Sequence, residues 1–73
     1  MTVLPIWTIY KMPGAPTMFV ARRFDVTSGR VDQTLHMVSA TNLPDLRDQM
    51  VRRGLALIPR SPADDAAIIE SWL

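Results

Sequence analysis

Several residue types and segments are scarce in this sequence, and their scarcity excludes whole classes of protein. There is no cysteine among the 73 residues, which excludes disulfide bonds and cysteine-ligated zinc. The single histidine, His36, excludes a metal site built from several histidines. The first ten residues lack the basic and long apolar regions of a secretion signal, so we expect none, and no run approaches the roughly 20 apolar residues of a membrane span. The sequence therefore predicts a cytoplasmic protein with no metal and no cofactor.

Charge and length narrow the possibilities further. Eight basic and seven acidic residues are interspersed, so the formal net charge is +1. This balance gives no electrostatic reason to expect binding to nucleic acid or to an anionic membrane. The apolar share of 48% is sufficient for a hydrophobic core. The length predicts a single domain over residues 1–73, with a stability on the order of 5 kcal/mol.

One segment has the pattern of an amphipathic helix. Its apolar residues recur at helical spacing and are Leu43, Leu46, Met50 and Val51. Asn42 can cap the first turn, because its side-chain carbonyl can accept hydrogen bonds from free backbone amides. Gly54 stands where a left-handed residue would end the helix. These signals predict a helix over residues 43–53.

Arg47 interrupts the apolar side of this helix. Its methylene groups can pack on the core while the guanidinium reaches the solvent. Alternatively, it can form a fixed ion pair with a carboxylate from another element, and Glu70 is the first candidate. A third possibility is that Arg47 anchors a small anionic ligand.

The remaining segments resemble strands. Residues 6–10, 18–26, 31–38 and 55–58 are rich in β-branched, aromatic and aliphatic side chains. A turn at Ser28-Gly29 predicts a hairpin between the second and third of these segments. Closing this turn pairs Val26 with Val31, Phe24 with Gln33, Arg22 with Leu35, Val20 with Met37 and Ala21 with His36.

The tail is ambiguous from periodicity alone. Residues 66–72 fit either a strand or a second helix that begins near Pro62. Trp7, the segment FVARR at 19–23, Leu43 and Arg47, RSPADD at 60–65 and IIESWL at 68–73 resemble a family of short uncharacterised bacterial proteins. The resemblance implies that the tail is a final strand, and it implies no activity. Ala66 departs from the family pattern, which tends to have proline there.

No residue set forms a catalytic signature. Asp64 and Asp65, with Glu70 nearby, form a carboxylate cluster, but adjacent aspartates in a proline-containing loop are typical of solvated turns. His36 has no neighbouring nucleophile, so a structural role is predicted. Arg22 and Arg23 near aromatic residues suggest an alternative role as a nucleic-acid accessory protein, with Arg52 and Arg53 contributing.

An apolar surplus is the most informative feature. The predicted fold is α+β, a mainly antiparallel sheet in the order β-β-β-α-β-β with one helix packed on one face. One helix covers one face, yet Trp7, Phe19, Ile68 and Trp72 supply apolar area for both faces. We therefore expect a small non-catalytic protein-interaction module that pairs with itself, as a homodimer, or with another protein, through these four residues. Alternatively, loops 11–17 and 59–65 could cover the second face.

Overall fold

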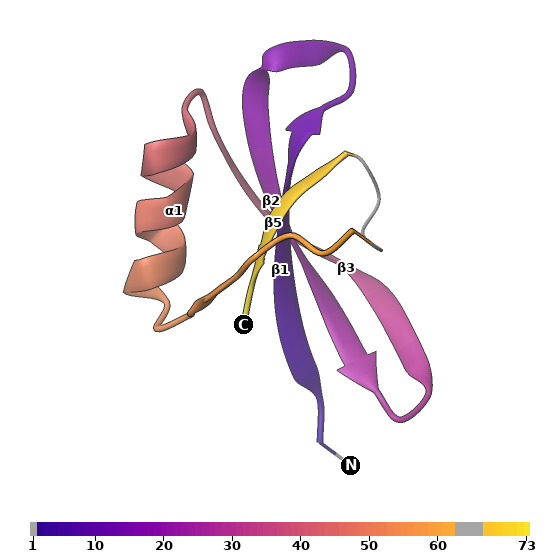
Figure 1. Cartoon of the computed structure of the whole chain (residues 1–73). Helices are drawn as coiled ribbons and strands as arrows, with labels where there is room; N and C mark the ends of the chain where they lie inside the picture. Colours follow the sequence, from indigo (N-terminus) through magenta and orange to yellow (C-terminus); the bar gives the residue numbers. More distant parts are fainter. Residues whose placement is uncertain (1, 63–66) are drawn as a thin grey trace.

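The computed structural model describes residues 2–62 and 67–73, which form a five-stranded antiparallel sheet with one helix (Figure 1). The elements in chain order are β1 (Leu4–Met12), β2 (Ala15–Thr27), β3 (Arg30–Ala40), α1 (Leu43–Arg52), β4 (Leu57–Ile58) and β5 (Ile68–Trp72). Across the sheet the order is β3-β2-β1-β5-β4. Helix α1 packs on one side of this sheet. The predicted α+β fold and its order of elements are confirmed.

Two tight turns organise the first three strands. Gly14 follows Pro13 between β1 and β2 and has a φ of +79°. Gly29 follows Ser28 between β2 and β3 and has a φ of +71°. Glycine occupies the left-handed region at little cost, so each dipeptide reverses the chain within two residues.

Helix α1 begins and ends where its caps predict. The Oδ1 of Asn42 accepts a hydrogen bond from the backbone N–H of Asp45 at 2.9 Å. Gly54, with a φ of +76°, follows the last turn. Leu46 and Met50 are fully buried, but Val51 is 60% exposed. The prediction that Val51 belongs to the buried side is therefore wrong, because the packed face is centred on Leu46 and Met50.

The core lies between α1 and one face of the sheet. Its buried residues are Trp7, Ile9, Ala21, Leu46, Met50 and Trp72. Phe19, Val38 and Ile69 pack around them. Trp7 and Ile9 share this face, as alternation along β1 predicts.

The β2–β3 hairpin has the predicted turn but not the whole predicted register. Val26 pairs with Val31 and Phe24 with Gln33, as expected. Beyond a β-bulge, Arg22 pairs with Met37, so its predicted pairing with Leu35 is wrong.

A side chain takes part in the ladder at this bulge. The hydroxyl of Thr34 donates to the carbonyl oxygen of Arg23 at 2.7 Å and accepts from the N–H of His36 at 3.1 Å. Leu35 is left 97% exposed. His36 does not oppose Ala21, which pairs with Val38.

The tail forms a strand, as the resemblance implied, although residue 66 lies outside the described residues. A second bulge interrupts its alternation, because Ile9 pairs with Glu70 while Tyr10 pairs with Ile68. Ile69 is the extra residue and packs against the core. Simple alternation along β5 would put Ile68 on the same face as Trp72, but the bulge turns Ile68 away from α1.

Candidate functional site

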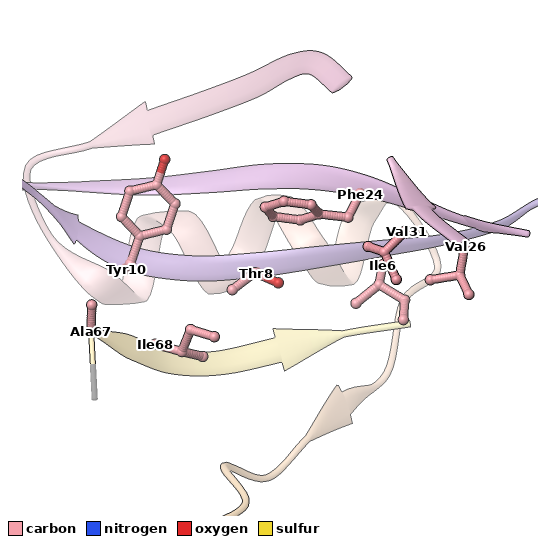
Figure 2. Close-up of a pocket in the computed structure, with 8 residues that line it drawn as sticks. All are labelled: Ile6, Thr8, Tyr10, Phe24, Val26, Val31, Ala67 and Ile68. Atoms are coloured by element: carbon pink, nitrogen blue, oxygen red, sulfur yellow. The ribbon is translucent and has the colours of Figure 1, made fainter. Parts of the chain in front are cut away.

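The sheet face opposite α1 is the candidate site. Ile6, Thr8 and Tyr10 of β1 point to this face, which we call the open face. In Figure 2 the labelled side chains stand on the near side of the sheet, and α1 lies behind it. The open face carries no helix from the described part of the chain.

A shallow groove of about 460 Å³ runs along the open face. It is lined by Ile6, Thr8, Tyr10, Phe24, Val26, Val31, Ala67 and Ile68 (Figure 2). Apart from the hydroxyl groups of Thr8 and Tyr10, these side chains are apolar. Thr8 is buried by its neighbours and forms part of the floor. Among the described side chains, those of residues 11–15 and 17 are not part of this lining.

Arg22 adds a positive charge to the open face. It is the cross-strand partner of Thr8, and it stands two residues before Phe24 on β2. Cross-strand partners and residues two apart share a face, so the guanidinium belongs to the same side as the groove. Its Nη2 lies 2.8 Å from the sulfur of Met37, an uncharged and weak acceptor. Its Nε is shielded from solvent and has no hydrogen-bond partner in the described structure.

A second polar cluster lies on the helix side of the sheet. Arg47 of α1 donates to Glu70 of β5, with Nη2 at 2.7 Å from Oε1 and Nε at 3.2 Å from Oε2. The indole Nε1 of Trp72 also donates to Glu70, at 2.7 Å. The Glu70 side chain is 6% exposed, whereas that of Arg47 is 47% exposed. The ion pair considered for Arg47 is therefore present, with the partner that the sequence placed first.

The surroundings of Glu70 decide its charge. Burial alone would raise the pKa of its carboxyl group. The hydrogen bonds from Arg47 and Trp72, together with the positive charge of Arg47, outweigh burial and hold the pKa of Glu70 below its ordinary value. The carboxylate is thus ionised and fully engaged at neutral pH. It ties α1 to β5 and leaves no free acid or base for chemistry.

The residues predicted to bind a partner separate into two groups. Trp7 and Trp72 are 7% and 6% exposed and lie in the core beneath α1. Phe19 packs against the same core. Ile68 lies on the open face and lines the groove. Binding through these four residues stays a prediction. Phe19 and Ile68 are both half-buried, and of the four only Ile68 is among the residues that line the groove.

Most residues of the open face were not among those predicted to bind a partner. Ile6 and Phe24 line the groove, and Arg22 lies beside it. A signal was available in the alternation of β2, which puts Val20, Arg22, Phe24 and Val26 on one face. An arginine within an otherwise apolar row marks a position where charge and apolar surface meet.

The other candidate residues do not form a site with one another. Arg23 is bonded to Asp25 at 2.7 Å and Arg52 to Asp48 at 2.9 Å. Arg53 stacks over the Trp7 ring, with 4.7 Å from its Cζ to the ring centroid. The four arginines considered for nucleic-acid binding are therefore divided among separate partners and two sides of the molecule. Asp64 and Asp65 lie outside the described residues.

Neither a metal-binding cluster nor a membrane-spanning helix is found among the described residues. In residues 2–62 and 67–73, no cluster of three or more histidine, aspartate or glutamate side chains could hold a metal ion. Across the same ranges, no helix has the length and apolar character to cross a bilayer. The resemblance to short bacterial proteins stays a prediction. Comparison with family models, with curated proteins and with solved structures finds no match to this chain.

Proposed function

We propose that the protein is a small non-catalytic interaction module of the cytoplasm that self-associates through the open face of its sheet. The observation that carries this proposal is the apolar groove opposite α1. An antiparallel sheet with one face toward water normally alternates apolar and polar residues. Here Ile6, Phe24, Val26 and Ile68 place apolar groups on the side that α1 leaves uncovered.

The size of the molecule agrees with such an interface. A standard interface buries about 800 Å² on each partner. The accessible surface of the chain is 4903 Å², so an interface of this size would use about a sixth of it. A second copy offers the same apolar face, and a two-fold axis would cover both faces at once.

Light scattering at micromolar protein concentration tests the proposal. We expect a dimer for the unaltered chain and a monomer for Phe24→Lys, because the new ammonium group would be buried in the interface beside Arg22 without a counter-charge. Val51→Lys is the matched control, since Val51 is exposed on α1, away from the open face. Circular dichroism establishes that both variants are folded. A monomeric unaltered chain, or a Phe24→Lys variant that dimerises as well as the control, would refute the proposal.

A further inference from the structure

Arg22 is the charged group that the described fold leaves without a counter-charge on the open face. The acidic residues of the described part are all engaged elsewhere. Asp25 is bonded to Arg23, Asp32 to Arg30, Asp45 to Asn42, Asp48 to Arg52 and Glu70 to Arg47. Arg22 instead contacts a thioether, and its Nε makes no hydrogen bond.

A guanidinium without a counter-charge, with one N–H shielded from water, is energetically unfavourable. A shielded N–H without an acceptor has lost its hydrogen bond to water without replacing it. Arginine has donors in a planar fork whose spacing matches the two oxygens of a carboxylate. A carboxylate that approached from the open face could pair with the terminal nitrogens of Arg22 and would give the guanidinium its counter-charge.

The groove beside Arg22 determines what else the ligand must carry. Its lining is apolar over Ile6, Phe24 and Ile68, and its volume of about 460 Å³ lies within the range of small-molecule sites. A ligand that satisfies both features has one carboxylate and an aliphatic or aromatic body of moderate size. With one arginine available, a singly charged acid fits better than a phosphate, whose second charge would lack a partner.

We propose that the open face binds a small apolar monocarboxylic acid, with its carboxylate on Arg22 and its apolar part in the groove. Thr8 is the cross-strand partner of Arg22 and also lines the groove, so the position of Arg22 adjoins the groove lining at Thr8. Tyr10 and Phe24 provide aromatic surface against which the apolar part of the ligand can pack (Figure 2). The site uses no residue of the Arg47–Glu70 pair, which is closed by its own hydrogen bonds.

This inference goes beyond the proposed function and makes a separate claim about the same face. A ligand in the groove would occupy surface that a second copy needs. Binding and self-association are therefore expected to compete, so that a saturating concentration of ligand converts dimer to monomer.

Octanoate, used well below its critical micelle concentration, is a suitable probe. Isothermal titration calorimetry is expected to show saturable binding with one site per chain. Arg22→Gln should weaken octanoate binding about tenfold or more, because it removes a charge-assisted, two-pronged contact. Arg22→Lys should restore part of the loss. The neutral alcohol 1-octanol should bind the unaltered chain and Arg22→Gln equally, which separates the charge contribution from apolar contact.

Methyl NMR locates the bound probe. Shifts confined to Ile6, Val26 and Ile68, with Leu46 and Met50 unaffected, are the expected result. Octanoate binding that is non-saturable, or equal in the unaltered chain and Arg22→Gln, would be adventitious apolar adsorption and would overturn the inference. The two proposals fail separately. A monomeric chain that binds octanoate removes self-association alone. A chain that dimerises at high concentration, and that binds no octanoate after dilution to a concentration at which it is monomeric, removes the ligand alone.

Discussion

The buried carboxylate of Glu70 accepts hydrogen bonds from three nitrogen atoms. Arg47 reaches it from α1 with two nitrogens, and Trp72 reaches it from two residues along the same strand. A buried charge left without partners would be strongly unfavourable. Here both oxygens accept hydrogen bonds, so the group fixes the position of α1 relative to β5. Arg47 thus holds α1 against β5. Helical periodicity alone could not show whether its guanidinium forms this ion pair or reaches the solvent.

Replacing Glu70 by glutamine should lower the free energy of unfolding by about 1–3 kcal/mol, since Arg47 loses its counter-charge and one of the two acceptor oxygens becomes an NH2 group that faces other donors. The loss stays below that of a fully buried pair because Arg47 remains half exposed and can be hydrated. Urea denaturation at neutral pH measures the difference. Asp32→Asn is the control: its ion pair with Arg30 is exposed, and its loss should cost at most about 1 kcal/mol. Equal effects of the two substitutions would contradict the structural role of Glu70.

The lowered pKa of Glu70 predicts that the stability of the protein depends on pH. The pKa of Glu70 is lower in the folded chain than in the unfolded one, so the unfolded chain binds a proton first as the pH falls. The stabilisation is therefore present above the ordinary glutamate pKa of about 4.3 and is lost as the pH falls through the folded value. Denaturation curves across this range should converge for the unaltered chain and Glu70→Gln. A constant gap between them at low pH would show that Glu70 does not titrate in this way.

At the scale of the elements, the two glycine turns and the helix caps were predictable because each depends on a short local pattern. The bulges were not. A shift of two residues leaves the alternation of β3 unchanged, so the apolar pattern cannot report that Arg22 pairs with Met37 rather than Leu35. The extra residue in β5 reverses which face Ile68 occupies. In the sequence, this bulge is indicated only by Ile68 and Ile69, which are apolar at two successive positions.

Gly29→Ala tests the hairpin turn. The φ of +71° at this position is unfavourable for a residue with a β-carbon, although an added methyl would meet no atom within 4 Å. The cost is therefore conformational and should be about 1 kcal/mol of unfolding free energy. Urea titration of this variant against Ser28→Ala, at the neighbouring turn position, isolates the effect. A Gly29→Ala variant as stable as Ser28→Ala would mean that the turn relaxes to another geometry.

At the scale of the whole molecule, one helix and one sheet face supply almost all of the core. Leu46 and Met50 are the fully buried contribution of α1. The sequence correctly predicted one helix packed on one face of the sheet. Of the four residues expected to supply apolar area for both faces, Trp7, Phe19 and Trp72 pack in or against the core under α1, and Ile68 lies on the open face. Strand alternation shows that both faces of the sheet carry apolar side chains. It does not show which of the two faces the helix covers.

Leu46→Ala should remove much of the stability of the domain. Truncating a fully buried leucine costs about 2–5 kcal/mol, and a chain of this size is expected to have only about 5 kcal/mol in total. Thermal melting followed by circular dichroism should show a large fall in midpoint or a chain already unfolded at room temperature. Val51→Ala, on the exposed side of α1, should stay within about 0.5 kcal/mol of the unaltered protein. A mild effect at Leu46 would place the core elsewhere.

The position of β1 between β2 and β5 has a consequence for synthesis. β1 gains its first neighbour as soon as the adjacent hairpin is made, but its second neighbour is translated only after α1 and β4. Until Trp72 has left the ribosome, the nascent chain therefore presents β1 as an unpaired edge, and such edges recruit strands from other chains. Closely spaced ribosomes on one message would bring these edges together, so the rate of translation beyond Thr27 would influence how much protein reaches the folded state.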